Sequence, residues 1–472
     1  MNIKIYIYSI LFCMFSFAYG QNYPVSHISF EQNNSNSVTK TIIRSYKEYA
    51  VSYIEDGGQH FFTITTIQDP QNPTNNMFIK KAEIDPQYNV TDFKIIDNYI
   101  YCCGIFTNNH AFVGYANIEN LLVHNSFDFN VHADFNNPHD QNHYVYTLSK
   151  LEIHKTETDY RIITIGRTHN DKQGTRACLM EIITTTLGNN NIAYKIGESP
   201  IEKETITGLA ITDKYIVTVG SLYDNTCTAI RKFYKNKIFN DSTNITNVYT
   251  YPTNEDYIPS LIGEKADNIL ATTIASDTIG TASYWYHAPA ANLGTDLQGV
   301  LLRIYDILPS PPTMITSISI NHNACTGNWN LNELQYNNII NAFTLLQYTN
   351  ISQYSLGSLF SRINFSNNPI VQSEYYQNIE LNSLFNIDGT RYCLLSGYNT
   401  SNKYAMLASK IDYYNASNTC GTYTTGSTSF LSIYKSKTET EPLITFGSNA
   451  TLNSIGCLSI NIFPLNNQCT KQ

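Results

Sequence analysis

The sequence has little charge and very little tryptophan. Charged side chains make up 14% of its 472 residues, and there are 2 Trp against 36 Tyr. Long coiled coils and charged disordered chains need far more charge, so both classes are excluded. The net charge of -9 argues against a nucleic-acid partner, because phosphate binding needs clustered positive charge. Aromatic residues reach 13%, which supplies side chains that β-strands favour.

Motifs of common enzyme classes are also missing. The chain contains no Gly-x-Ser-x-Gly, His-Glu-x-x-His or P-loop motif. It contains no Cys-x-x-Cys, which disfavours a zinc ribbon and a thioredoxin-like redox site. No pattern among the acidic residues selects the carboxylate pair that a glycosidase needs. We therefore predict no cofactor, and the sequence identifies no catalytic residue.

The first 20 residues have the pattern of a signal peptide. Lys4 precedes an apolar stretch from Ile5 to Phe17, and Ala18-Tyr19-Gly20 provides small residues before a cut that leaves Gln21 first. The stretch is too short for a membrane-spanning helix, and no second run of that length follows. We expect a secreted, periplasmic or cell-surface protein without a transmembrane segment after cleavage.

The cysteines cannot all pair within the mature chain. Only Cys13 of the 10 Cys lies in the leader, so an odd number remains. Cys102, Cys103 and Cys393 lie in apolar runs, where we expect free, buried thiols. If a disulfide forms, we expect it among the cysteines near the C-terminus, Cys420, Cys457 and Cys469.

The strongest pattern is an internal repeat of short apolar strands that end in Gly. Five copies have this form: Ile100–Gly104, Ile162–Gly166, Ile216–Gly220, Cys393–Gly397 and Leu443–Gly447. Three less regular copies are Phe61–Ile67, Ile269–Thr273 and Phe343–Gln347. The basal spacing is about 50 residues, with loop insertions, which is a period typical of repeat architectures.

Each copy is flanked by further strands. A strand precedes the apolar run across a short turn, as at Asp97-Asn98, Asp213-Lys214 and Asp388-Gly389, and another strand follows. Such repeated meanders predict an all-β fold, a β-propeller of about eight four-stranded antiparallel blades, with seven as the alternative. The five Gly are predicted to occupy equivalent positions in successive blades.

The layout resembles the secreted β-propeller proteins of bacterial cell envelopes, over residues ~39–465. It has no Trp-Asp or kelch-type signature, so the resemblance implies an architecture and no activity. We expect a signal peptide at 1–20, an N-terminal segment at 21–38, one propeller domain at 39–465 and a tail at 466–472. Either Val25 to Phe30 or Thr39 to Ser45 could close the ring as an outer strand of the last blade.

Histidines gather between positions 124 and 154, together with three Asp. Imidazole and carboxylate groups can bind zinc, which makes metal candidates of His124, His132, His139 and His143, with His154 nearby. Their spacing matches no standard ligand motif, so we predict no metal. The polar stretch Asn125–Asn142 instead predicts a long exposed loop.

The stretch from Ala275 to Asn332 is the candidate ligand-binding region. It accounts for the longest step between copies and contains both Trp. Long loops on a rigid scaffold often carry binding sites. Aromatic faces there would suit a sugar ring, and the predicted contacts are Tyr284, Trp285, Tyr286, His287 and Trp329. The alternative is that these rings cover an underlying blade.

These observations favour a secreted, non-catalytic propeller that binds a glycan, a peptide or an envelope protein through a loop face. The rival is a polysaccharide hydrolase or lyase on the same scaffold. Converging carboxylates at the ring axis would favour the enzyme, whereas exposed aromatics alone would favour binding. A third interpretation, a structural subunit of a surface assembly, predicts a broad apolar side patch.

Overall fold

The computed structural model describes residues 26–29, 37–66, 78–107, 109–189, 192–222, 227–235, 238–239, 248–252, 263–286, 297–321, 325–351, 356–364, 370–377, 379–387, 392–399, 404–410, 422–425, 427–430, 437–439, 444–450, 452–454, 459–464 and 466–467. Nearly all of these residues lie in β-strands. A short π-helix, η1 (Asn120–His124), is the one helical element of this described part. None of its helices is long and apolar enough to cross a membrane. The predicted all-β class is confirmed.

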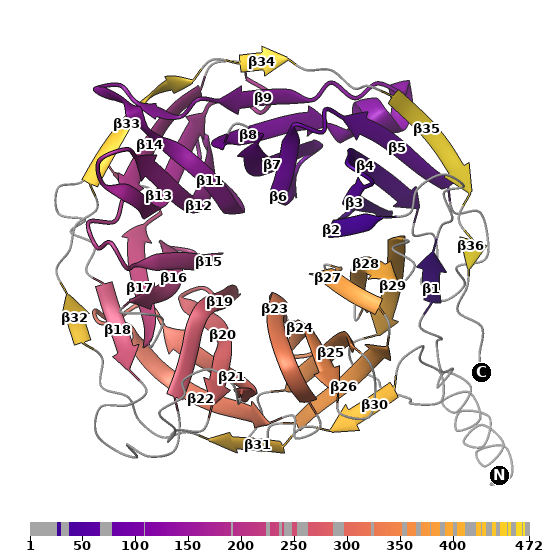
Figure 1. Ribbon diagram of the computed structural model, residues 1–472, viewed down its shortest axis with the longest axis vertical. Helices are drawn as coiled ribbons and strands as arrows, with labels where there is room; N and C mark the ends of the chain where they lie inside the picture. Colours follow the sequence, from indigo (N-terminus) through magenta and orange to yellow (C-terminus); the bar gives the residue numbers. More distant parts are fainter. Residues whose placement is uncertain are drawn as a thin grey trace, which may run out of the picture.

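The strands form seven antiparallel sheets that stand as blades around a central axis (Figure 1). Blades 1 and 2 contain β2 (Val38–Tyr46), β3 (Tyr49–Asp56), β4 (Gln59–Thr66) and β5 (Phe78–Ile84), then β6 (Tyr88–Ile96), β7 (Tyr99–Phe106), β8 (His110–Asn117) and β9 (Asn130–Ala133). Blades 3 and 4 contain β10 (Asn136–Asn137), β11 (Asp140–Lys155), β12 (Tyr160–Asn170), β13 (Gly174–Thr184) and β14 (Ile192–Glu198), then β15 (Thr205–Ile211), β16 (Tyr215–Leu222), β17 (Cys227–Tyr234) and β18 (Val248–Pro252).

The remaining blades complete the ring. Blades 5 and 6 contain β19 (Gly263–Ala275), β20 (Thr278–Tyr286), β21 (Leu297–Asp306) and β22 (Thr313–Asn321), then β23 (Cys325–Asn337), β24 (Ala342–Ile351), β25 (Leu356–Asn364) and β26 (Ile370–Gln377). Blade 7 contains β27 (Ile379–Asn386), β28 (Tyr392–Asn399), β29 (Tyr404–Lys410) and, from the other end of the chain, β1 (Ser26–Ser29). β1 pairs with β29, so the N-terminal segment closes the ring. The propeller is therefore confirmed, and its seven blades agree with the alternative count rather than with the eight predicted first.

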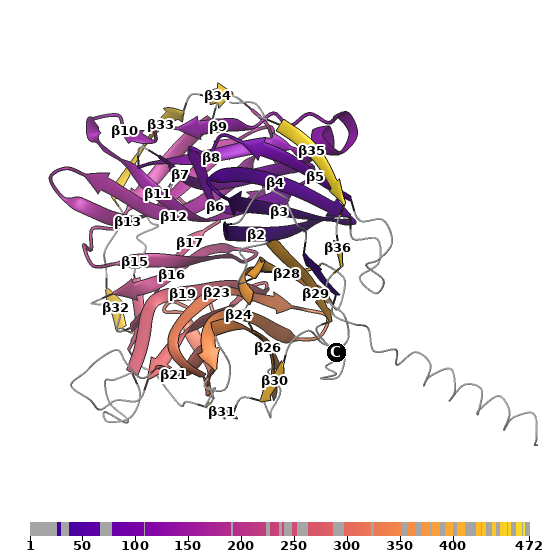
Figure 2. The ribbon, with the colours of Figure 1, turned by 45° about the vertical axis from the view of Figure 1, so that its right-hand side comes forward.

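Each blade also receives a strand from the C-terminal segment, which we call the C-terminal belt (residues 422–467). The belt visits blades 6, 5, 4, 3, 2, 1 and 7 in that order, as β30 (Thr422–Thr425), β31 (Ser427–Phe430), β32 (Lys437–Glu439), β33 (Ile444–Ala450), β34 (Leu452–Ser454), β35 (Ser459–Pro464) and β36 (Asn466–Asn467). Figures 1 and 2 show these yellow strands on the outside of the ring. Six blades therefore have five strands instead of the predicted four, and blade 3, which also contains β10, has six. β36 lies in the stretch expected to be a tail and pairs with β1.

The belt explains why the sequence pattern favoured eight blades over seven. The copy Leu443–Gly447 falls largely in β33, where Gly447 pairs with Lys195 on the outer edge of blade 3. It is apolar and strand-forming like the other copies, but it adds to an existing sheet. Gly447 is therefore not equivalent to the other four Gly.

The other four predicted Gly do occupy equivalent positions. Each lies in the second strand of its blade, facing the innermost strand. A Cβ added there would come within 1.7 to 2.0 Å of a backbone carbonyl oxygen on that strand, at Gly104, Gly166, Gly220 and Gly397. No side chain fits at that distance, so Gly is needed for the close approach of the two backbones.

Opposite these positions, the innermost strands carry a bulge. In six blades one short polar residue of the innermost strand has no partner residue in the register with the second strand. These residues are Thr39, Thr91, Ser149, Thr207, Asn332 and Asn382. Several of these side chains bond to the next blade. Thr91 Oγ1 donates to the carbonyl of Leu148 at 2.6 Å, and Asn332 Nδ2 donates to that of Leu381 at 2.5 Å. The bulges therefore link neighbouring innermost strands around the axis.

Apolar side chains fill all seven interfaces between neighbouring blades. Blades 1 and 2, for example, share a cluster that includes Phe62 and Phe93, whereas Ile43 and Leu394 belong to the cluster between blades 1 and 7. Packing on both faces explains why second strands such as β16 are buried at every position instead of alternating. These clusters hold the ring closed, because each blade buries its apolar surface against two others.

Two expected loops contain strand instead. The stretch Asn125–Asn142 includes β9 and β10, and Phe127, Phe129 and Phe135 are buried in it. The expectation of an exposed loop was wrong because the many Asn and Asp obscured the apolar residues between them. Most described residues of Ala275–Asn332 lie in β20, β21, β22 and the first half of β23. The long step arose because Thr273 belongs to an innermost strand, whereas Gln347 belongs to a second strand.

The thiols that the structure describes are buried and free, as predicted for Cys102, Cys103 and Cys393; Cys178 shares this state. Burial raises the pKa of the Cys103 thiol to about 12. Cys420, Cys457 and Cys469, the predicted site of a disulfide, lie outside the described residues.

Candidate functional site

The innermost strands surround a cavity of about 290 Å³ on the ring axis, which we call the axial cavity. Its lining comes from β2, β6, β11, β15, β19, β23 and β27, and so from every blade. Residues two apart on a strand point to the same side. This periodicity directs three polar pairs toward the cavity: Asp92 with Lys94, Lys150 with Glu152, and Glu333 with Gln335.

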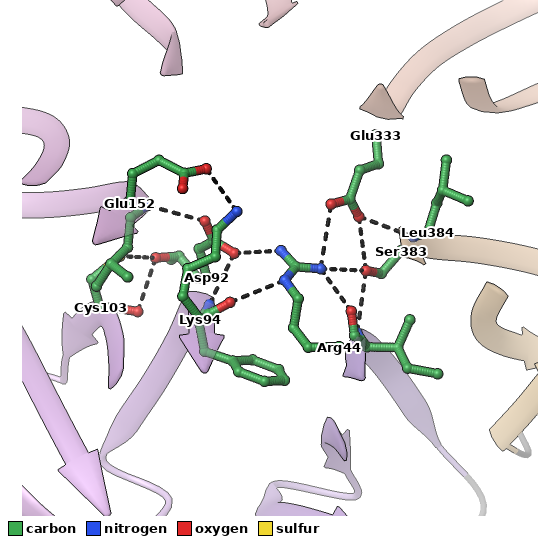
Figure 3. Close-up of polar contacts among 12 residues, drawn as sticks. Arg44, Asp92, Lys94, Cys103, Glu152, Glu333, Ser383 and Leu384 are labelled. Atoms are coloured by element: carbon green, nitrogen blue, oxygen red, sulfur yellow. Dashed lines mark hydrogen bonds and ion pairs between the residues drawn. The ribbon is translucent and has the colours of Figure 1, made fainter. Parts of the chain in front are cut away.

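Arg44 lies at the centre of the charged part of this cavity, between two carboxylates (Figure 3). Its Nη2 is 2.7 Å from Oδ1 of Asp92, and its Nη1 is 3.3 Å from Oε1 of Glu333. The guanidinium also donates to the backbone carbonyls of Phe93 and Ile43, at 3.0 and 2.7 Å. We call Arg44, Asp92 and Glu333 the Arg44 network. Burial lowers the pKa of Arg44, but Glu333 and Asp92 outweigh it and raise the pKa overall.

Asp92 is held by the backbone as well as by Arg44. Its Oδ1 accepts from the amide of Phe93 at 2.9 Å, and its Oδ2 accepts from the amide of Leu151, on blade 3, at 3.0 Å. Burial raises the pKa of Asp92, but Arg44 and then Lys150 and Lys94 lower it below its usual value overall. The carboxylate therefore stays ionised and joins blades 1, 2 and 3.

Glu333 joins blade 6 to blade 7. Its Oε2 accepts from the hydroxyl of Ser383 at 2.8 Å and from the amide of Leu384 at 2.9 Å. Its Oε1 accepts from Gln335 Nε2 at 3.3 Å, in addition to the contact with Arg44. Both oxygens of this carboxylate are therefore engaged by groups of the protein.

Lys94 and Glu152 form a second ion pair nearer to solvent. Their charged atoms are 2.7 Å apart, and the two side chains are 28% and 29% exposed. Burial lowers the pKa of Lys94, but the negative charge of Glu152 outweighs it and raises the pKa overall. This pair is accessible from the cavity, whereas Arg44 and Asp92 are each only 4% exposed.

Lys150 is the remaining charged residue of the lining. Among the residues that the structure describes, its ammonium has no ion-pair or hydrogen-bond partner. β15 and β19 supply a wall without charged side chains, which includes Gly208, Ala210, Leu270 and Thr272. The axial cavity thus combines a cation without an ion pair or hydrogen bond among the described residues, a partly exposed ion pair and an uncharged wall.

The aromatic residues predicted to bind a ligand lie in strands of blades 5 and 6. Tyr284 is buried in the apolar cluster between these blades, so the alternative that it covers a blade holds for this ring. The backbones of Trp285 and Tyr286 belong to β20, and that of Trp329 belongs to β23, which lines the axial cavity. The side chains of these three, and all of His287, lie outside what is described.

The candidate metal-binding histidines do not converge. His124 and His139 are exposed, on η1 and in a turn, whereas His132 is buried and stacks on Tyr115 with ring centroids 5.8 Å apart. His143 Nε2 lies 2.5 Å from a carboxylate oxygen of Glu198. Within the described ranges, no three His, Cys, Asp or Glu side chains could hold a metal ion together.

The charged residues of the axial cavity were missed in the sequence. They come from innermost strands that are far apart along the chain, and no single stretch contains an acid-base pattern. A weak sequence pattern lies directly before these charged residues. The short polar residue of each bulge follows an aliphatic residue, as in Val90-Thr91, Leu148-Ser149 and Leu331-Asn332. The residues one and three positions after these bulges are the polar pairs that face the cavity.

Comparison with known proteins identifies no relative. No family model and no curated protein match the chain. It is similar to a solved structure described as a bifunctional GH43-CE protein of Bacteroides eggerthii, with 8% sequence identity and a TM-score of 0.17. The match covers 86% of this chain and 63% of that one, so the chain spans less than two thirds of that protein's length. A likeness this weak identifies neither a family nor an activity, and the fold assignment rests on the seven sheets.

Proposed function

We propose that this chain is an exported, non-catalytic binding protein whose axial cavity holds one end of a glycan or peptide. The observation that carries the proposal is a solvent-accessible cavity, built by all seven innermost strands, whose charged side chains other than Lys150 are held in ion pairs. Such a cavity is pre-organised, because its side chains do not need to be ordered when a ligand enters. The signal-peptide pattern at residues 1–20 supports export.

The size of the cavity favours the end of a chain over a folded partner. Ligand sites in proteins usually enclose about 300–1,000 Å³, and the volume here, 290 Å³, lies just below that range. One or two sugar or amino-acid residues are of that order. The rest of the ligand would leave the cavity at a loop face, and Trp285 and Trp329, whose side chains lie outside the described residues, remain predicted contacts.

The state of the carboxylates favours binding over hydrolysis. A glycosidase needs one carboxyl group that donates a proton and a second that acts as base or nucleophile. Asp92 has a lowered pKa and is bonded to Arg44 and two backbone amides, so it cannot serve as the proton donor near neutral pH. Glu333 accepts four contacts, and Glu152 is paired with Lys94.

One observation favours a hydrolase as a second candidate. Three carboxylates, Asp92, Glu152 and Glu333, come from three different blades to one cavity, which is the convergence that such chemistry needs. Catalysis would require at least one of them to leave its cation when substrate binds. Release of reducing ends from polysaccharides, followed in wild type and in a Glu152→Gln variant, distinguishes the two candidates.

A blocked cavity provides the direct test of binding. Thr272, in the uncharged wall on β19, is partly exposed, so Thr272→Trp would fill the cavity without removing a charge. Thr175→Trp, at an exposed position of β13, is the matched control. Isothermal titration calorimetry would compare wild type and both variants against short oligosaccharides, uronic acids and dipeptides, after circular dichroism has confirmed the β-sheet signal.

We expect at least one compound to bind wild type and Thr175→Trp but not Thr272→Trp. If the Trp variant does not fold, Thr272→Met is the smaller substitution, and it should weaken the same compound. Equal binding to the blocked and control variants would place the site elsewhere. Failure of every compound to bind wild type would contradict a small-ligand site in the axial cavity.

A further inference from the structure

We infer that the axial cavity recognises a sugar acid, with the ligand carboxylate on Lys150 and a ligand hydroxyl on Glu152. This inference rests on the proposed function and names the chemistry of its ligand. It is carried by the distribution of engaged and unengaged polar atoms around the cavity.

The first step is the cation. Arg44 is already bonded to Asp92, Glu333 and two backbone carbonyls, and Lys94 is bonded to Glu152. Lys150 lines the same cavity but has no such partner among the described residues. Both oxygens of the neighbouring Asp92 are already occupied. A partly buried ammonium is stabilised by an anion, and a carboxylate is the anion that one Lys can neutralise.

The second step is an acceptor beside that cation. Glu152 is two residues from Lys150 on β11, so both side chains point to the cavity about 7 Å apart along the strand. One oxygen of Glu152 bonds Lys94, and its other oxygen has no partner within the part of the chain that the structure describes. A carboxylate oxygen accepts hydrogen bonds and donates none. It therefore selects a ligand hydroxyl near the ligand carboxylate.

The third step is the uncharged wall. Gly208 and Ala210 on β15 and Leu270 on β19 contribute backbone and aliphatic surface without charge. A ring with carbon-bound hydrogens on one face can lie against such a wall, whereas a second charged group would lose its hydration there without a partner. The lining therefore fits one carboxylate, hydroxyl groups and a compact ring. This combination is found in uronic acids and other sugar acids.

The probes are D-glucuronate and D-galacturonate, each compared with the neutral sugar of the same stereochemistry, D-glucose and D-galactose. Affinities would be measured by calorimetry with residues 21–472, for wild type and Lys150→Gln. Lys172→Gln, at an exposed position in the turn of the same blade, is the matched control. Lys150→Arg restores the charge and serves as a rescue variant.

We expect at least one uronate to bind wild type about tenfold or more tightly than its neutral partner, since a charge-assisted hydrogen bond is about twice as strong as a neutral one. Lys150→Gln should remove this difference, Lys150→Arg should restore part of it, and Lys172→Gln should leave it unchanged. Raising the salt concentration should weaken the uronate more than the neutral sugar.

Equal affinity for the uronate and its neutral sugar, or an unchanged preference in Lys150→Gln, would overturn the inference. It would also be overturned if neither uronate binds. If another compound still binds wild type and is lost in Thr272→Trp, the axial cavity remains the binding site and only the ligand class is wrong. If no compound depends on Thr272, the proposed function fails as well.

Discussion

Replacing Arg44 with Met should destabilise the ring strongly, because it leaves a buried carboxylate without its cation. Arg44 and Asp92 are each 4% exposed, and their charged atoms are 2.7 Å apart. Removal of one partner from a buried ion pair costs about 3–5 kcal/mol. Arg44 also donates to two carbonyls and contacts Glu333, so we expect a loss within that range. Since domains are stable by only about 5–15 kcal/mol, urea unfolding would report the loss as a much lower midpoint.

The pH dependence separates this electrostatic cause from lost packing. In wild type the pKa of Asp92 is lowered overall, so its contribution to stability is present above the ordinary carboxyl pKa and is lost as pH falls through the folded value. In Arg44→Met the pKa of Asp92 should rise, because burial remains and the main opposing charge is gone. Protonation of Asp92 then removes the unpaired buried charge in the variant, and the difference in unfolding free energy from wild type should shrink between pH 7 and pH 4.

Two further variants complete the test. Arg44→Met combined with Asp92→Asn should recover part of the loss, which would appear as a coupling energy of about 1 kcal/mol or more in a double-mutant cycle. Arg167→Met, on the exposed side of β12, should change stability by no more than about 0.5 kcal/mol. A loss below about 1 kcal/mol in Arg44→Met, or a difference that does not shrink at acid pH, would refute the reasoning.

Three other predictions follow from the fold. Gly220→Ala should cost more than about 3 kcal/mol or prevent folding, because its Cβ would lie 1.7 Å from the carbonyl oxygen of Thr205. Gly58→Ala has open space around the new Cβ but a φ of +80°, so it should cost about 1–2 kcal/mol. Equal losses of stability for the two variants in thermal unfolding would contradict this. Truncation after residue 421 removes the belt and exposes the outer strand edges of the blades. Exposed strand edges pair with other chains, so size-exclusion chromatography should show that the truncated chain associates. A stable monomer would refute the belt's protective role. Burial lowers the pKa of Lys81 to about 8, so the unfolded chain binds more protons than the folded chain between pH 8 and 10. The free energy of unfolding should therefore rise over that interval, on the order of 2 kcal/mol. Lys81→Met should lose this rise, and an unchanged dependence of unfolding free energy on pH in the variant would contradict the assignment.

The ring was predictable because its repeating unit lies in consecutive residues. The apolar runs that end at Gly104, Gly166 and Gly220 are second strands, packed on both faces and close to the innermost strand, and both constraints are visible in sequence. The number of blades was less accessible. The run ending at Gly447 has the same composition, and only its pairing with β14 shows that it belongs to an existing blade.

The site was hidden because it is assembled from single residues of many blades. Nothing adjacent in sequence relates Arg44 on β2 to Glu333 on β23, which the closure of the ring brings within 3.3 Å. Blade 5 was predicted as an inserted loop for a different reason. Tyr284, in the second strand of blade 5, lies beside the bulge of the innermost strand, at the position that Gly220 has in blade 4. Because blade 5 lacks this Gly, its strands did not match the repeat pattern.

The most direct measurement is a crystal structure of residues 21–472 with a compound that binds wild type but not Thr272→Trp. We predict electron density for that compound inside the axial cavity, with a polar atom of the ligand within hydrogen-bond distance of Lys150 Nζ and the Arg44 network unchanged. Density for the compound at an outer loop face, with only water in the axial cavity, would contradict the central claim.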